Sequence, residues 1–175
     1  MIAALWNAAA AVPDPEIPVL SVADLGILRG VEWDEADPAT VVVTVTPTYS
    51  GCPATEAITA SLRDALQAAG APRVRIETRL SPAWTTDWIT TEGKRKLVEF
   101  GIAPPGARRA DSPIAAIDVS RLRWPRRAAT SAAPIACPRC GSRRTQLLSQ
   151  FGSTACKAHY RCLDCLEPFD YFKPH

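Results

Sequence analysis

The sequence predicts an α+β domain followed by a small β ribbon held by a metal ion. Helix-type and strand-type patterns alternate over residues 1–103, a length that suffices for a domain with its own core. The composition then changes to a basic stretch rich in Pro, Ala and Arg over residues 104–133, and two Cys-x-x-Cys pairs follow in residues 134–175. We therefore divide the chain of 175 residues into a first domain, a linker and a cysteine ribbon.

Four segments of the first domain carry helix patterns, and prolines or glycines mark their ends. Pro53 suits the first turn of a helix, because its missing N–H would have no intrahelical partner there. Ser21 is a candidate N-cap, and Gly26 and Gly101 are candidate helix ends. The expected helices are residues 1–11, a short helix over residues 21–26, residues 53–69 and residues 91–100.

Three segments of the first domain carry strand patterns. Residues 40–46 are rich in β-branched side chains, which suit a pleated surface. Residues 73–80 alternate polar and apolar side chains, as a half-buried strand does. Residues 29–33 are a weaker candidate, and the acidic segment 34–38 that follows them is typical of a hairpin turn. Helices and strands mixed in this way indicate the α+β class.

The tail is expected to fold as β hairpins around a metal ion. Strand-like segments occur at residues 147–148, 157–161 and 169–172. A fragment of about 40 residues cannot bury enough apolar surface to fold on its core alone. Metal binding must therefore supply the missing free energy.

Four cysteines with metal-ligand spacing are the strongest chemical signal in the chain. Each Cys-x-x-Cys turn offers two thiolates, and two such turns complete a tetrahedral shell of the kind that zinc prefers. A pair of disulfides is the alternative, but the chain is otherwise poor in cysteine, and a redox pair of the thioredoxin type would need a βαβ setting. We expect a closed, structural zinc site at Cys137, Cys140, Cys162 and Cys165.

The composition also bears on where the protein works. No run approaches the ~20 apolar residues of a membrane span, so no membrane partner is expected. The first 11 residues lack a basic region and include Trp6 and Asn7, which indicates an amphipathic helix and not a signal peptide. Free thiols without such a signal indicate the cytoplasm.

Charge is distributed unevenly along the chain. The net charge is −5 over residues 1–103, +4 over residues 104–133 and +3 over residues 134–175. The basic linker can lie across its own acidic domain, which is the reading we prefer, or the basic half can contact a partner or nucleic acid.

Cys52 is the residue of greatest interest in the first domain. It lies between Gly51 and Pro53, where the orphan N–H groups and dipole of a helix start favour a thiolate, so it can be reactive or a metal ligand. A small buried thiol that packs as a hydrophobe is an equal alternative. A cysteine hydrolase would need a base, and the histidines, His159 and His175, both lie in the tail.

Other metal-ligating side chains are scattered along the sequence. Asp14, Glu16 and Asp24 can supply hard oxygen ligands beside a soft thiolate, or they are solvated acids and a helix cap. Cys156 and His159 are three positions apart on an expected strand and so point to opposite faces. Cys156 is therefore a packed thiol or a spare ligand.

Two parts of the sequence resemble known families. The segment 14–26, the Val-rich strand and the segment 48–53 resemble the metal–sulfur cluster assembly domain, over residues 12–103. That family has a small two-layer α/β fold and a cysteine in the loop that holds Cys52 here. The tail, with its two cysteine pairs and the Phe151–Lys157 segment, resembles the PaaD family of bacterial phenylacetate degradation.

The resemblance implies an accessory component of the phenylacetyl-CoA epoxidase system, without turnover of its own. Cys52 would be the transfer ligand for iron or an iron–sulfur cluster, with Asp14, Glu16 and Asp24 in support. The oxygenase and reductase subunits would be its partners, with the ribbon as a docking module. The sequence agrees, since it contains no set of Glu-x-x-His motifs for a di-iron centre and no GxGxxG loop.

Two other functions are weighed against this one. A zinc ribbon that binds nucleic acid would use the basic tail and its aromatic side chains at Tyr160, Phe169, Tyr171 and Phe172. A thiol enzyme would attack a CoA thioester through Cys52. The oligomeric state is left open by the sequence.

Overall fold

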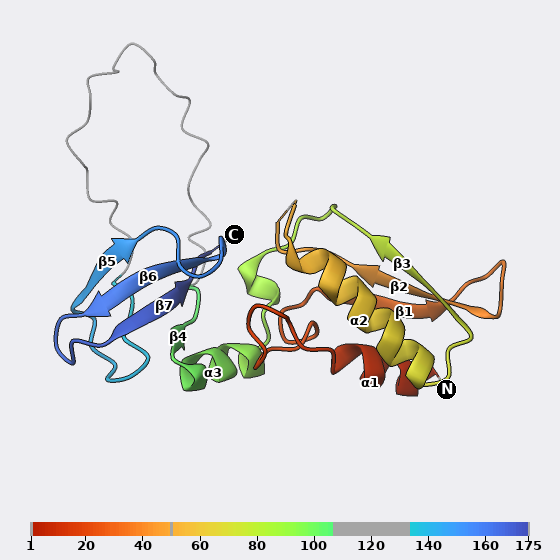
Figure 1. Cartoon of the computed structure of the whole chain (residues 1–175), viewed down its shortest axis with the longest axis horizontal. Coiled ribbons are helices and arrows are strands. Elements are labelled where there is room, and N and C mark those ends of the chain that lie inside the picture. Colours follow the sequence, from red (N-terminus) through yellow and green to blue (C-terminus); the bar gives the residue numbers. More distant parts are fainter. Residues whose placement is uncertain (1, 50, 107–133, 175) are drawn as a thin grey trace, which may run out of the picture.

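The computed structural model describes residues 2–49, 51–106 and 134–174, so residues 107–133 of the predicted linker lie outside the described residues. Figure 1 shows a first body that holds α1 to α3 and a second body formed by the last strands of the chain. The elements are, in chain order, α1 (Ile2–Ala10), β1 (Leu28–Trp33), β2 (Thr40–Val45), α2 (Ala54–Ala68), β3 (Arg73–Thr78), the 3-10 turn η1 (Thr86–Trp88), α3 (Thr91–Phe100), β4 (Ile102–Ala103), β5 (Thr145–Ser149), β6 (Lys157–Cys162) and β7 (Pro168–Phe172).

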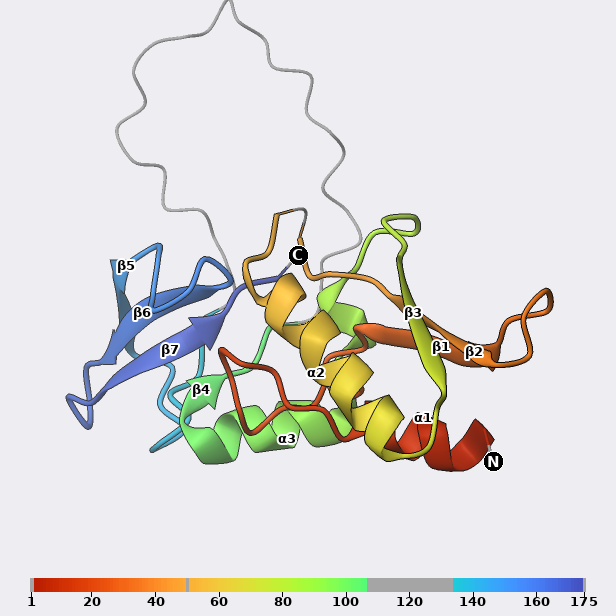
Figure 2. The same cartoon turned by 45° about the vertical axis from the view of Figure 1, so that its right-hand side comes forward.

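The first body is built on a sheet with the strand order β1-β2-β3. β1 and β2 are antiparallel, and the predicted turn joins them, with the N–H of Asp34 donating to the carbonyl of Thr40 at 2.9 Å. β3 lies parallel to β2, and α2 forms the crossover between them. α1 and α2 contact each other and the sheet, and Figure 2 shows α2 lying across it. The α+β class and the two-layer arrangement of sheet and helices are confirmed.

Most of the predicted elements are confirmed, and one is wrong. The segment 21–26 forms a single turn instead of a short helix. Ser21 and Asp24 do cap each other, because the Ser21 N–H donates to Asp24 Oδ2 at 3.0 Å and the Asp24 N–H donates to Ser21 Oγ at 3.1 Å. Gly26 then takes a positive φ of 70°, and the N–H of Ile27 returns to the carbonyl of Val22, so the chain leaves the helical path after one turn.

The second body is a sheet with the strand order β4-β7-β6-β5. β5, β6 and β7 are the predicted antiparallel ribbon. β4, which directly follows α3, lies parallel to β7 and places Ile102 opposite Asp170. The end of the segment predicted as the first domain therefore supplies a strand to the ribbon's sheet, and this strand attaches the two bodies to each other.

The main hydrophobic core crosses from the first body into the ribbon. Cys156 and Phe172 belong to the same cluster of buried side chains as Leu25 and Leu62. The rings of Trp84 and Phe172 lie 6.2 Å apart between centroids, and the Trp84 indole N–H donates to the carbonyl of Leu25 at 2.8 Å. The ribbon thus buries part of its apolar surface against the first body, in addition to its own small core.

The lengths and polarities of the helices bear on whether any of them could span a membrane. Within the described residues, every helix is too short or too polar to cross a bilayer.

Candidate functional site

The four knuckle cysteines form a preformed cage in the ribbon. Their sulfur atoms all lie within 4.8 Å of one another. Cys137 Sγ is 3.8 Å from Cys165 Sγ, and Cys140 Sγ is 3.6 Å from Cys162 Sγ. Zinc bonded to four thiolates at ~2.3 Å places neighbouring sulfurs ~3.8 Å apart in a tetrahedron. These two pairs of sulfurs therefore already have the spacing that a tetrahedral zinc ion requires.

Local backbone geometry forms each knuckle of this cage. The first closes at Gly141, which has a positive φ of 76° and whose N–H donates to the carbonyl of Cys137 at 2.9 Å. In the second, the N–H of Cys165 points at Cys162 Sγ at 3.5 Å. That backbone N–H is the main cause that lowers the pKa of Cys162 to about 6. The second turn thus presents Cys162 as the thiolate that a metal requires.

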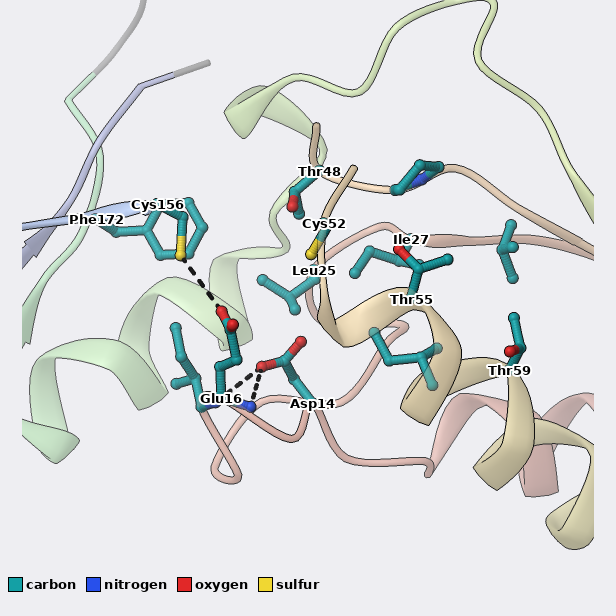
Figure 3. A pocket seen from close by; sticks show the side chains of 14 residues that line it. Asp14, Glu16, Leu25, Ile27, Thr48, Cys52, Thr55, Thr59, Cys156 and Phe172 are labelled. Carbon is teal, nitrogen blue, oxygen red and sulfur yellow. Dashed lines mark hydrogen bonds between the residues drawn. The ribbon is translucent and has the colours of Figure 1, made fainter. Parts of the chain in front are cut away.

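A second candidate site is a small cavity between the two bodies, shown in Figure 3. Asp14 and Glu16 reach it from the loop between α1 and β1, and Cys52 reaches it from the loop before α2. Cys156 and Phe172 close it from the ribbon. The cavity has a volume of about 20 Å³, and its walls are mostly apolar. It brings together two thiols and two carboxylates that are far apart in the sequence.

Asp14 is fixed in this cavity by its own loop. Its Oδ1 atom accepts hydrogen bonds from the N–H of Glu16 at 2.9 Å and from the N–H of Ile17 at 2.8 Å. Only 7% of the residue is exposed. Burial raises the pKa of Asp14 in spite of these bonds and of the nearby charge of Lys157. Its second carboxylate oxygen faces the cavity in Figure 3.

Cys156 faces Glu16 across the boundary between the bodies. Its Sγ lies 3.9 Å from Glu16 Oε2 and 3.0 Å from Thr154 Oγ1. Burial raises the pKa of the Cys156 thiol, and the charge of Glu16 acts in the same direction. Cys156 is thus a packed thiol that also lines the cavity, and it stands apart from the zinc cage.

Cys52 lies just before α2, as expected. It is half-buried, and its carbonyl accepts the N–H of Thr55 at 3.1 Å. Pro53 takes the N-cap position, one residue before the position predicted for it. Burial, followed by the charge of Cys52 and a hydrogen bond with it, raises the pKa of Tyr49 to about 12. The phenol therefore stays protonated near neutral pH and can donate to the Cys52 sulfur.

The other candidate residues lie outside the cavity. Asp24 accepts a hydrogen bond from Lys96 Nζ at 2.8 Å. Burial tends to raise the pKa of Asp24, but the bonds from Lys96 and Ser21 outweigh it and leave this pKa below its usual value. His159 Nδ1 lies 3.1 Å from Asp170 Oδ1 in the ribbon, and His175 lies outside the described residues. Among the described residues, the zinc cage is the only group in which three or more ligand atoms of His, Cys, Asp or Glu lie within 4.8 Å of one another.

Sequence reasoning missed Tyr49 as a neighbour of Cys52, and it missed that Cys156 lines the same cavity as Cys52. Tyr49 lies three positions before Cys52 in the sequence. Its contact with Cys52 could have been predicted, because a phenol O–H can donate a hydrogen bond to a nearby sulfur. No local sequence pattern indicates that Cys156 and Cys52 line the same cavity, because their proximity depends on how the ribbon docks on the first body.

Comparisons with known proteins cover nearly the whole chain. Residues 2–77 match the family described as an iron–sulfur cluster assembly protein, and residues 124–173 match the PaaD zinc beta ribbon domain. A protein of Escherichia coli (strain K12), provisionally named as one of the subunits of 1,2-phenylacetyl-CoA epoxidase, is 42% identical over 174 residues, which are 97% of this chain and 90% of that protein.

Solved structures resemble about half of the chain. A DUF59 domain of unknown function from Bacillus anthracis has 24% identity and a TM-score of 0.49 over 55% of this chain and 90% of its own. A Mycobacterium tuberculosis protein associated with Fe–S complex assembly and repair has 32% identity and a TM-score of 0.35 over 57% of this chain and 84% of its own.

Proposed function

The chain belongs to the PaaD family of phenylacetyl-CoA epoxidase subunits, and we propose that it is a maturation factor within that system. Its task is to deliver iron or an iron–sulfur cluster to the oxygenase or to the reductase that serves it. It carries out no turnover itself, and Cys52 is the residue that holds the metal during transfer. The likeness of residues 2–77 to an iron–sulfur cluster assembly protein supports this assignment.

The observation that carries the proposal is the set of polar side chains that line the cavity together with Cys52. The polar groups that share the cavity with this thiol include the carboxyl groups of Asp14 and Glu16 and a second thiol at Cys156. A nucleophilic cysteine needs a base such as histidine, and the described histidine, His159, is bonded to Asp170. Thiols beside carboxylates are the ligands that iron and other metals of intermediate softness accept.

The zinc cage has a different task in this proposal. Four thiolates close the coordination shell of zinc and leave no open position for a substrate or an exchange ligand. The zinc ion therefore holds the ribbon, and metal in transit is bound elsewhere. The close approach of the four sulfurs supports zinc as the resident metal.

The packing of the tail disfavours the nucleic-acid alternative. Tyr160 stacks on Phe169 at 5.9 Å between ring centroids and meets Tyr171 edge-on at 5.7 Å. Phe169 and Phe172 are 4% and 1% exposed. A platform for single-stranded nucleic acid needs open aromatic faces, and these rings are largely covered by the protein itself.

The proposal is tested by purifying the epoxidase components from cells that carry the wild-type protein, the Cys52→Ala variant or no copy. We expect the same amounts of oxygenase and reductase polypeptides in all three. Phenylacetyl-CoA oxidation and iron content should be high only with the wild-type protein. Equal activity and equal iron content in the three preparations would exclude a maturation role.

A further inference from the structure

The cavity around Cys52 exists only because the ribbon docks. The first body supplies one wall, and Cys156 and Phe172 of the ribbon supply the other. Pairing of β4 with β7 and the contact between the Trp84 and Phe172 rings fix the ribbon in this position. A ligand that occupies this cavity and binds Cys52 would therefore also contact the ribbon.

Donor atoms of two kinds, sulfur and oxygen, face this cavity. Figure 3 shows the sulfurs of Cys52 and Cys156 projecting into the same space, with the Glu16 carboxylate between the two walls. Cys156 is 6% exposed and Asp14 is 7% exposed, so neither is a surface group that water alone would satisfy. Lys157, whose charge lies near Asp14, has its Nζ 3.6 Å from Asp170 Oδ2 instead. The cavity therefore gathers two thiols and two carboxyl groups, and the nearby Lys157 is already paired.

The size of the cavity decides which ligand it can take. A volume of about 20 Å³ is that of roughly one water-sized occupant, since a single water needs at least ~10–15 Å³. A single ion therefore fits this space. The donor atoms do not lie as close together as those of the zinc cage, so the ion must draw them inward.

We propose that Cys52, Cys156 and Glu16 bind one divalent metal ion of intermediate softness, such as Fe²⁺, at the boundary between the first body and the ribbon. Both thiols lose their protons to solvent on binding, and the ion is held by two thiolates and one carboxylate. The inference rests on the proposed function, because it identifies the ligands that complete the Cys52 site. It also assigns the ribbon a part in metal binding that is separate from its zinc.

Anaerobic titration of the zinc-loaded full chain with Co²⁺ tests this site. Cobalt replaces Fe²⁺ in such sites, and each thiolate bond to it gives a sulfur-to-cobalt charge-transfer absorption. We expect one Co²⁺ per chain beyond the zinc, with about half of this absorption lost in Cys52→Ala and in Cys156→Ala, and all of it lost in the double variant. Glu16→Gln should keep the absorption but weaken binding at least ~10-fold, because a ligand is lost.

Controls and outcomes separate this inference from the function on which it rests. Asp24→Asn, a carboxylate outside the cavity, should bind Co²⁺ as the wild type does. Zinc content and far-ultraviolet circular dichroism verify the fold of each variant, and Cys156→Ser replaces Cys156→Ala if the alanine variant does not fold. If Cys52→Ala abolishes the absorption while the Cys156 variants keep all of it, the shared site is wrong and the role of Cys52 survives. If the wild type takes up no cobalt beyond zinc, or if Cys52→Ala changes nothing, both proposals are wrong.

Discussion

The Cys156 sulfur lies 3.9 Å from the Oε2 atom of Glu16, although 140 positions separate the two residues in the sequence. Glu16 belongs to the proline-rich loop of the first body, and Cys156 directly precedes β6 of the ribbon. The two bodies therefore share one cavity. Changes to the ribbon should therefore alter the surroundings of Cys52 and the stability of the first body. The following predictions test this coupling.

Removal of zinc should make Cys156 reactive. Cys156 is 6% exposed while the ribbon is folded, and the ribbon should lose its fold without metal. Alkylation followed by mass spectrometry of the separated peptides measures the modification rate of each cysteine. We expect Cys156 to react much more slowly than the half-buried Cys52 in the zinc-loaded protein, and at a rate similar to Cys52 after chelation. Equal rates for Cys156 with and without zinc would show that the ribbon does not depend on the metal.

Loss of one knuckle sulfur should empty the cage. Cys140 is one of the four ligands, and a Cys140→Ser change removes a thiolate that the tetrahedral shell needs. We expect elemental analysis to find little or no zinc in this variant. We also expect a lower unfolding temperature of the first body, because Cys156 and Phe172 would leave its core. An unchanged zinc content would contradict the assignment of the ligands.

Phe172 should stabilise the whole protein. Its side chain is 1% exposed and packs against Trp84. Truncation of a buried aromatic side chain typically costs about 3–5 kcal/mol, and Phe172→Ala should lower the free energy of unfolding by that order in urea titrations. Phe151→Ala is the matched control, since Phe151 is 67% exposed, and its effect should be within about 0.5 kcal/mol. Similar small effects in both variants would mean that the ribbon does not share the core.

Asp24 should contribute to stability and not to metal binding. The hydrogen bonds from Lys96 and Ser21 hold the pKa of Asp24 below its usual value of 3.8. Its contribution is therefore present above that value and is lost as the pH falls through the lower pKa of the folded state. Asp24→Asn should cost about 1.5–3 kcal/mol near neutral pH, as expected for a hydrogen bond to a charged group. The difference from the wild type should shrink in acid.

The control for this prediction is Asp64→Asn, since Asp64 is an exposed residue of α2. This variant should change the free energy of unfolding little at any pH. A stability difference for Asp24→Asn that grows in acid would contradict the sign of the argument.

Much of this structure could be predicted because its determinants are local. The Val-rich β2 and the helix-ending Gly101 act through neighbouring residues, so pattern alone located the strands and α3. The spacing of the knuckle cysteines likewise predicted the cage. The turn at Ser21 was predicted as a helix because its capping bonds are those of a helix start, and only the return of Ile27 to Val22 ends it early.

The shared cavity could not be predicted from the sequence. β4 has only two residues, too few for any periodic signal, and yet its pairing with β7 attaches the ribbon to the first body. The position of Cys156 beside Glu16 follows from that docking. No pattern near either residue indicates the other, so this part of the site needed the tertiary structure.

Metal transfer itself tests the account most directly. Zinc-loaded protein carrying one radioactive Fe²⁺ is mixed without oxygen with metal-depleted oxygenase or reductase subunits, in the presence of a chelator that captures free iron. The proteins are then separated and counted. The account predicts that iron reaches a client from the wild-type protein but is lost to the chelator when Cys52→Ala is used. Equal iron uptake by the client from the wild type, from Cys52→Ala and from a simple Fe²⁺ salt would contradict it.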